Sequence, residues 1–336
     1  MVTIDDVARA AGVSTSTVSY ALSGRRPISP ATRERVAAAI AELGYHPHAG
    51  ARALASSRSS VLALVAPLRS DINVPVIMEF VTAVVTAARE HNYDVLLLTK
   101  DEGTAGLQRV AGGAMVDALI VMDVESDDAR VPALLGLRQP SVLIGLPTEP
   151  TGLSCVDLDF EATARACVEH LADHGHRRIA LVGPAPGVYQ RGTSYANRFL
   201  TGFTGAMTAL GGQVVAEPCD PSRSGVRDCL DRIGPDVTAL VVHNEAALVP
   251  LLDLLRVDGR RVPEDVSVVA ICPRDAVPPL PVRLTTAEIP AHEVGTLAVT
   301  MAMRLLDSPV ATAPETRLLP PVIVARDSVS PPDLLR

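Results

Sequence analysis

A row of polar side chains near the N-terminus has the spacing of one face of a short helix. A glycine turn precedes the polar residues Thr15, Ser16, Ser19 and Tyr20. Hydroxyl groups presented in this way can hydrogen-bond to the edges of base pairs in the major groove of DNA. The same pattern fits a solvated face on a purely structural helical bundle, so the surrounding elements must decide between the two interpretations.

Capping residues predict three short helices around this row. Thr3 opens the first helix as part of a capping box, and Ser14 and Ser29 cap the second and third. Gly12 and Gly44 supply the stops of the first and third helices. The predicted helices cover residues 4–11, 15–22 and 30–43. The first two, joined by a turn that contains glycine, have the pattern of a helix-turn-helix.

Charge is distributed unevenly along the 336 residues. The whole chain carries a formal net charge of −8, which by itself argues against a nucleic-acid partner. Residues 1–60 hold seven arginines against four carboxylates, a balance of +3. The remainder is at −11, with 23 basic and 34 acidic residues. A small basic unit attached to a large acidic body is a pattern to test for nucleic-acid binding.

Several classes of protein are disfavoured by composition and motifs. The five cysteines include no C-x-x-C pair, which argues against a disulfide framework and fits a reduced, cytoplasmic setting. The N-terminus lacks the form of a signal peptide, and we expect no membrane span. His174 and His176 flank a glycine without a third ligand nearby, so we expect a structural role and no metal site. No phosphate or dinucleotide loop and no nucleophile elbow is found, so we expect neither a cofactor nor an enzyme.

From Val61 onward, apolar runs of strand type alternate with helical stretches. The runs are VLALVAPL, YDVLLLT, ALIVMDV and SVLIGL, then RIALVG, QVVAEP, TALVVHN and DVSVVAIC. The predicted helices between them lie near residues 76–91, 107–113, 129–137, 161–174, 195–210, 225–233 and 245–258. Such alternation predicts two open α/β lobes with parallel sheets. A ligand would bind in the cleft between them, outside the carboxyl ends of the strands.

The N-terminal run TIDDVARAAGVSTSTVSYALSG and the later ISPATRERV, LGYHP and ARALA resemble the headpiece of the LacI/GalR family of transcription regulators. HLADHGHRRIA, NEAAL, VPEDVSVVA, LTTAEIPAHEVG and a closing strand at VARDSV extend the resemblance along the chain. It implies an all-α helix-turn-helix headpiece with a hinge helix, followed by a periplasmic-binding-protein-like α/β core. The implied domains are a headpiece over 1–46, a hinge and linker over 47–60, an N-terminal lobe from 61–158 and 289–312, and a C-terminal lobe from 159–288 and 313–330.

The resemblance also implies which residues contact a palindromic operator. Thr15, Ser16 and Tyr20 stand where family members reach base edges, although many of them carry arginine in place of Tyr20. Phosphate contacts are implied for Thr3, Ser14, Thr17, Ser19 and Arg35. The hinge helix over 48–55 adds His48, Ala51, Arg52 and Leu54. Leu54 matches the leucine that is wedged between base pairs in the minor groove.

Effector contacts are implied in the cleft between the lobes. Asn244 matches the cleft asparagine of the family, with Glu245 where aspartate is usual. The cleft arginine of the family falls at Phe199, one residue after Arg198, so either residue could take its place. Cys272 replaces a ligand-binding aspartate. Further candidates from strand ends, aromatic placement and the loop PAPGVYQRGTSY are Arg69, Asp71, Asp123, Tyr189 and Arg191.

The segments RALASSRS, VAPLRSDINVPV and LSCVDLDF are similar in sequence to cellobiose-responsive repressors of actinomycetes. This implies a repressor released from its operator by cellobiose or a cello-oligosaccharide. Other glucosides, a maltose-type sugar or a nucleobase remain alternative effectors. A solute-binding transport protein and a sugar-modifying enzyme are the competing classes. No heptad extension follows VARDSV, which favours a homodimer over a tetramer.

Overall fold

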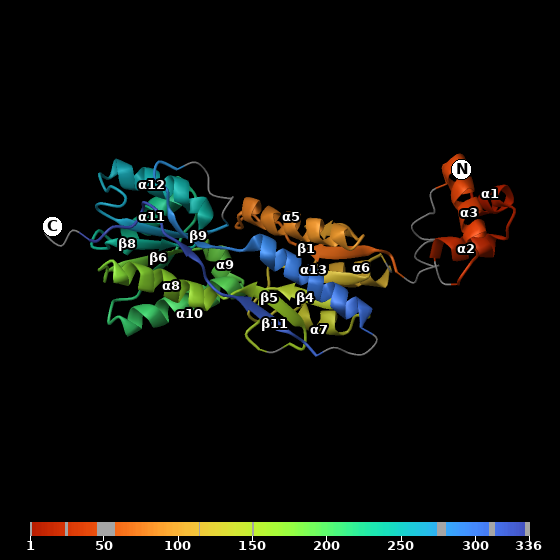
Figure 1. The fold of residues 1–336 in the computed structure, drawn as a ribbon. Helices are drawn as coiled ribbons and strands as arrows, with labels where there is room; N and C mark the ends of the chain where they lie inside the picture. The colour runs from red at the N-terminus through yellow and green to blue at the C-terminus, as the bar shows by residue number, and fades with distance from the viewer. Residues whose placement is uncertain are drawn as a thin grey trace.

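The computed structural model describes residues 2–23, 26–45, 58–113, 115–149, 151–273, 280–308 and 313–332. Within these ranges the chain forms a small helical headpiece and two α/β lobes (Figure 1). None of the helices in the described ranges has the length and apolar character that a membrane crossing requires.

The headpiece contains the three predicted helices, α1 (Ile4–Ala11), α2 (Thr15–Ser23) and α3 (Pro30–Leu43). Its capping box is confirmed, because the Thr3 hydroxyl accepts from the Asp6 amide and the Asp6 carboxylate accepts from the Thr3 amide. The Ser29 hydroxyl accepts from an amide in the first turn of α3 at 3.2 Å. Gly12 and Gly44 end their helices with φ of 64° and 59°, a conformation that glycine adopts without steric cost.

A small apolar core joins the three helices of the headpiece. Val7, Val18 and Val36 are buried at its centre, one from each helix. Val13 and Ala21 pack against the same cluster from the turn and from α2. The inward face predicted for the second helix is therefore confirmed, and the opposite face of α2 is left for solvent or a partner.

The first lobe is a parallel sheet with strand order β11-β5-β4-β3-β1-β2. Its strands are β1 (Val61–Val65), β2 (Asp94–Leu98), β3 (Ala118–Val121), β4 (Ser141–Ile144), β5 (Ser154–Leu158) and β11 (Thr316–Leu319). Leu62 and Leu64 face the cluster that holds α5 (Val74–Glu90) and α13 (Ala291–Asp307). Ala63 and Val65 face α6 (Gly103–Gly112) and α7 (Val131–Leu135). Because both faces are covered, the central strands β1 and β3 are apolar without alternation.

The second lobe repeats this plan with strand order β12-β10-β9-β8-β6-β7, parallel except for β12. Its strands are β6 (Ile179–Gly183), β7 (Val215–Pro218), β8 (Ala239–Val242), β9 (Ser267–Cys272), β10 (Thr285–Glu288) and β12 (Ile323–Val324). Helices α8 (Phe160–Asp173) and α10 (Ser194–Ala209) cover one face. Helices α11 (Arg223–Ile233) and α12 (Leu248–Val257) cover the other. The predicted α/β architecture of two sheet lobes is thus present (Figure 1).

The chain passes between the lobes after β5, after β10 and after β11. Helix α13 returns to the first lobe and packs closely on α5, where a Cβ at Gly295 would lie 2.6 Å from that of Ala83. Strand β11 pairs with β5 in the first sheet, and only β12 belongs to the second. The predicted assignment of all of 313–330 to the second lobe is corrected accordingly, because residues 316–319 complete the first sheet.

Three further expectations for the second lobe need adjustment. The segment PAPGVYQRGTSY, predicted as a loop, contains the short helix α9 (Pro186–Gln190). A closing strand was expected at VARDSV, but only its first residue, Val324, belongs to β12. The rest of the segment is held by Ser328, whose hydroxyl donates to a carbonyl of β9 and accepts from the first amide of β10. The helix predicted from residue 245 begins as the 3-10 turn η1 (Glu245–Ala247).

Candidate functional site

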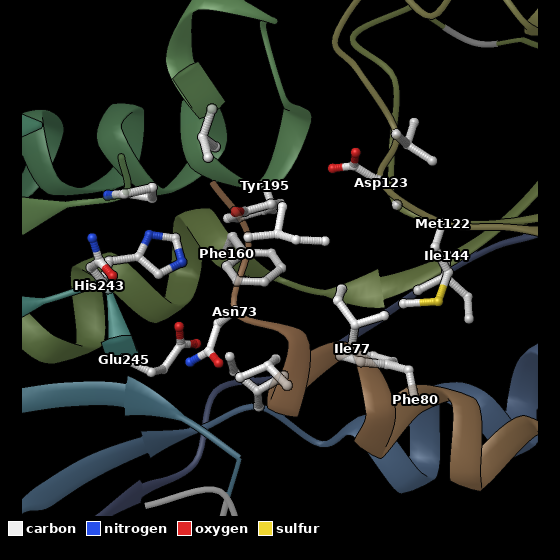
Figure 2. A pocket seen from close by; sticks show the side chains of 18 of the residues that line it. Asn73, Ile77, Phe80, Met122, Asp123, Ile144, Phe160, Tyr195, His243 and Glu245 are labelled. Atoms are coloured by element: carbon white, nitrogen blue, oxygen red, sulfur yellow. The ribbon is translucent and has the colours of Figure 1, made fainter. Parts of the chain in front are cut away.

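A cavity lies between the two lobes at the carboxyl ends of their strands (Figure 2). In each sheet the strand order reverses beside the first strand, β1 or β6, and crevices at such points bind ligands in α/β proteins. The cavity encloses about 910 Å³, including the part open to solvent. Its lining comes mainly from segments that follow β1, β3, β6 and β8 and from α5. Those residues are 71–73, 76, 77, 80, 122–124, 144, 145, 157, 160, 184, 185, 188, 195, 243–245 and 289.

The first-lobe wall of the cavity is largely apolar. Val76, Ile77 and Phe80 project from successive turns of α5, and Met122 and Ile144 follow or end the neighbouring strands (Figure 2). These side chains offer dispersion contacts and no hydrogen-bonding group apart from a weak thioether acceptor. This wall therefore suits an apolar face of a ligand.

The second-lobe wall combines aromatic rings with polar groups. Phe160 and Tyr195 lie with ring centroids 5.5 Å apart at the starts of α8 and α10. Asn244 is 8% exposed, and its side-chain amide donates to the carbonyls of Cys219 at 2.8 Å and Gly183 at 3.4 Å. With both donors used by the protein, the Asn244 side-chain oxygen is the group left to accept from a ligand.

Three cavity carboxylates are each paired with an arginine. Asp123 pairs with Arg69, which also donates to Asp101 at 2.8 Å. Asp123 has a φ of 53°, in the left-handed region that aspartate adopts more readily than most non-glycine residues. Met122, Asp123 and Val124 all line the cavity, so this turn lies in its wall.

The remaining two pairs bring segments of the two lobes together. Asp71 pairs with Arg191 across the cavity mouth, and Asp157 pairs with Arg198 of α10. A Cβ at Gly187 would crowd the Asp71 carboxylate, so glycine there allows α9 to approach this side chain closely. The lobes are therefore joined by charge pairs that also neutralise the cavity.

Burial, more than neighbouring charge, determines the titration of two cavity acids. It raises the pKa of Asp157 to about 6 even though Arg198 opposes the shift. Burial also raises the pKa of Glu245 to about 7, while a hydrogen bond from Asn73 acts in the opposite direction. Figure 2 shows the Asn73 amide beside the Glu245 carboxylate, which links α5 to the segment after β8. Near neutral pH the cavity consequently carries little net charge.

The predicted effector residues separate into three groups. Asp71, Asp123, Asn244 and Glu245 line the cavity. Three predicted arginines do not line the cavity but form ion pairs with its carboxylates, namely Arg69, Arg191 and Arg198. Tyr189, Phe199 and Cys272 are not among the described lining residues.

The third group lies behind the wall for identifiable reasons. Phe199 is fully buried beneath His243, with centroids 4.2 Å apart, and Arg198 rather than Phe199 reaches a cleft carboxylate. The Tyr189 hydroxyl lies against Gly183 at the end of β6. Cys272 is buried in the core under α11 and α12. Helical spacing and strand position could not show which way these side chains point.

Sequence reasoning missed several lining residues, among them Asn73, Asp157, Phe160, Tyr195 and His243. His243 had an available signal, because it directly precedes Asn244 at the end of the run TALVVHN. Asp157 had none, since its role depends on its pairing with α10. Within the described residues no cluster of histidine, cysteine and carboxylate side chains has the form of a metal site.

The recognition face predicted on the headpiece is accessible. Thr15 and Ser16 are exposed at the start of α2, as are Thr3 and Arg35, whereas Thr17, Ser19 and Tyr20 are half-buried. The Ser14 hydroxyl accepts from the Thr17 amide at 3.2 Å and caps α2. Arg26 lies 5.3 Å from the centre of the Tyr20 ring. The hinge positions His48, Ala51, Arg52 and Leu54 lie outside the described residues.

Comparison with known proteins connects the headpiece and the cleft. Residues 3–48 match the lacI family of bacterial regulatory proteins, and residues 168–329 match a periplasmic binding protein-like domain. The chain is 32% identical over 342 residues to the transcriptional regulator CelR of Thermobifida fusca, covering 94% of this chain and 96% of CelR. This chain belongs to the LacI family. It is a transcriptional repressor of that family by this similarity, and its similarity to CelR agrees with the resemblance seen in the sequence.

Other LacI-family proteins share both the sequence and the fold. Catabolite control protein A of Priestia megaterium is 27% identical, with 91% of each chain covered. The structure of the CelR–cellobiose complex superposes with a TM-score of 0.70 at 28% identity, covering 98% of this chain and all of that one. The lac repressor dimer bound to operator and the anti-inducer ONPF gives a TM-score of 0.82 at 25% identity, covering 98% and 99%. The headpiece and both lobes therefore have counterparts in these regulators.

Proposed function

We propose that this LacI-family repressor binds a palindromic operator as a homodimer and is released when its cleft binds cellobiose or a short cello-oligosaccharide. The observation that carries the choice of ligand class is the charge compensation of the cavity. Asp71, Asp123 and Asp157 each have an arginine partner, and burial raises the pKa of Glu245 to about 7. A charged effector would find no complementary excess charge here, whereas a neutral polyhydroxylated ligand fits.

The two walls of the cavity support a sugar in particular. Pyranose rings have apolar C–H faces and a rim of hydroxyls. The apolar side chains of α5 and the rings of Phe160 and Tyr195 suit the faces, while Asn244 and Glu245 suit the hydroxyls. Cellobiose is favoured among sugars by the similarity to CelR, whose solved complex contains it.

The headpiece supplies the operator contacts in this proposal. Thr15, Ser16 and Tyr20 face base edges from α2, and Thr3 and Arg35 contact phosphates beside them. Ser14, Thr17 and Ser19 complete the phosphate contacts. Leu54, with His48, Ala51 and Arg52 in the hinge, enters the minor groove and bends the duplex.

Effector and operator are coupled through the lobes. A sugar held by residues of both lobes favours the arrangement that brings Asp71 near Arg191 and Asn73 near Glu245. If that arrangement disfavours the operator-bound dimer, sugar and operator weaken each other by the same factor. The coupling is therefore measurable from either side.

Calorimetric titration of the full chain with glucose, cellobiose, cellotriose, maltose and adenine tests the ligand. We expect binding of cellobiose or cellotriose and a fall in operator affinity at fixed salt when either sugar is saturating. Binding of maltose or adenine instead would show that cellobiose is not the effector, while the proposed role as a repressor would stand. Unchanged operator affinity with bound sugar would refute the release mechanism.

The minor-groove role has its own test. The Leu54→Ser variant should bind operator more weakly than the unmodified chain and bind sugar with the same affinity. A Leu135→Ser variant, changed at a residue that is 52% exposed on α7, is the matched control. Equal operator affinity in the two variants would contradict the insertion of Leu54 into the minor groove.

A further inference from the structure

His243 occupies a distinctive position in the cleft. It follows β8 directly, and its backbone amide donates to the Val182 carbonyl of β6 at 2.8 Å, so its backbone belongs to the sheet edge. Its side chain lines the cavity but is only 3% exposed. The imidazole is therefore fixed at the base of the site, next to Asn244, although sequence analysis assigned no role to His243 itself.

Three aromatic rings hold the imidazole in place. Phe199 lies behind it at a centroid distance of 4.2 Å, Phe160 lies at 5.6 Å, and Tyr195 presents an edge at 5.5 Å. These rings come from the first turn of α8 and the first two turns of α10. The apolar cluster that contains Phe199 and Phe203 packs both helices against the second sheet. A ring enclosed in this way has little freedom to turn, so the direction of its nitrogens is determined by the packing.

One ring nitrogen lacks a partner in the described part of the protein. His243 Nδ1 is buried and makes no hydrogen bond there. Leaving a buried polar group unpaired costs about 1–3 kcal/mol, and most such groups in folded proteins are satisfied. Figure 2 shows the imidazole beside the Phe160 ring, and His243 is one of the residues that line the cavity.

We infer that His243 is a specificity-determining residue of the effector site, where its imidazole hydrogen-bonds to a hydroxyl group of a neutral sugar. This inference rests on the proposed function and adds a named contact to it. The hydroxyl satisfies the nitrogen that the protein leaves unpaired. The neighbouring Asn244 side-chain oxygen is positioned to accept from the same part of the ligand.

The chemistry of the imidazole matches a hydroxyl in particular. Burial lowers the pKa of His243 to about 3, so the ring is neutral throughout the physiological range. A neutral imidazole has one donor and one acceptor, and a hydroxyl group likewise donates and accepts. Glu245 is the acid that follows in the same segment, and Tyr195 and the two phenylalanines face the ring from the opposing helices. The three aromatic neighbours carry no charge, and the neutral imidazole itself offers none with which to select an ion.

Single-hydroxyl deletions in the ligand provide the test. Wild-type protein, His243→Phe and His243→Asn are titrated calorimetrically with cellobiose and with its monodeoxy analogues. Phenylalanine retains the stacking and removes both nitrogens, whereas asparagine retains a polar group. Phe199→Leu is the matched control, because it disturbs the packing of the ring and keeps its nitrogens.

We expect one monodeoxy analogue to bind wild-type protein about tenfold more weakly than cellobiose, the scale of one hydrogen bond. His243→Phe should bind cellobiose about tenfold more weakly and should no longer distinguish that analogue. His243→Asn should recover part of the affinity, and Phe199→Leu should keep the discrimination.

The remaining outcomes separate the inference from the proposed function. If His243→Phe and His243→Asn bind cellobiose like the wild type, or discriminate every analogue as the wild type does, the inference is overturned and the proposed function stands. If Phe199→Leu loses discrimination as fully as His243→Phe, the residue has only a packing role. Failure of the wild-type chain to bind any sugar in the panel of glucose, cellobiose, cellotriose and maltose would overturn both.

Discussion

The headpiece and the cleft both present polar side chains for recognition, but they position them by different means. On α2, Thr15 and Ser16 are exposed, and the capping hydroxyl of Ser14 makes its bonds within three residues along the chain. In the cleft, Asp157 is 6% exposed, and its arginine partner is 41 residues away in sequence. Local hydrogen bonds determine one surface, and contacts distant in sequence determine the other.

This difference has an energetic consequence. An exposed polar group has water as an alternative partner, so losing a neighbour costs little. A buried charge has no such alternative, so each cleft carboxylate depends on its arginine or on a proton. The cleft should therefore be far more sensitive than the headpiece to single polar substitutions, and four predictions test this contrast.

The largest effect is expected for Arg198→Met, which leaves Asp157 buried without its cation. Removing one partner of a buried pair costs about 3–5 kcal/mol of unfolding free energy. Urea unfolding at pH 7.5 measures the loss, and the double variant Arg198→Met/Asp157→Asn should recover part of it. A loss no greater than that of Arg35→Met, at an exposed position on α3, would break the contrast.

Glu245→Gln should remove a pH dependence of stability. The folded-state pKa of Glu245, about 7, lies above its ordinary value of 4.5, so the folded chain binds the proton more tightly. Stability is therefore highest below the ordinary value and falls as the pH rises through 7, by about 3 kcal/mol.

Urea unfolding between pH 4.5 and 8 measures this slope in wild type and in Glu245→Gln. The pKa of Asp157 is also raised, to about 6, so part of the slope should persist in the variant. The difference between the two curves belongs to Glu245. Parallel curves would show that the carboxylate is solvated.

Ser14→Ala should cost the headpiece about 1 kcal/mol, because it removes the side-chain acceptor for the Thr17 amide at the start of α2. Hydrogen exchange of headpiece amides in the full chain should accelerate about fivefold, while exchange in the lobes stays unchanged. Thr15→Ala, at an exposed position without a capping bond in the described contacts, is the control.

Arg9→Ala should have the smallest effect. Its ion pair with Asp6 spans one helical turn, and the two side chains are 78% and 38% exposed. Exposed pairs of this kind contribute little because water screens them. The Tm of the full chain should not change measurably, and a decrease comparable to that of Ser14→Ala would show that exposed pairs matter in the headpiece.

Much of the fold could be predicted because its signals are local. The capping serines, Gly12 and Gly44 mark the headpiece helices, and unbroken apolar runs such as SVLIGL mark strands covered on both faces. The assignment of residues 316–319 failed because an edge strand with exposed side chains, TRLL, carries little hydrophobic pattern. Its place depends on pairing with β5, far away in sequence.

The candidate site was predictable only in part for the same reason. Asp71 and Asp123 follow strands of the first sheet, and this position identified them, whereas Asn244 and Glu245 were predicted from the resemblance to the LacI/GalR family. Position could not show that Phe199 supports an imidazole from behind, or that Asp157 faces the cavity. Those facts depend on how α8 and α10 pack against the second sheet.

By itself, the sequence determined the helices of the headpiece, the alternation of strands and helices, and membership of the LacI family. Helix caps, hydrophobic periodicity and motifs depend on residues that are close together in sequence, so they can be recognised from the sequence alone. Only the tertiary structure decided which carboxylate each arginine neutralises and which protons the acids keep. It also decided that His243 lines the cleft with a buried Nδ1 that has no hydrogen-bond partner among the described residues. Burial and charge pairing depend on distances in space, and those distances exist only once the two lobes have packed together.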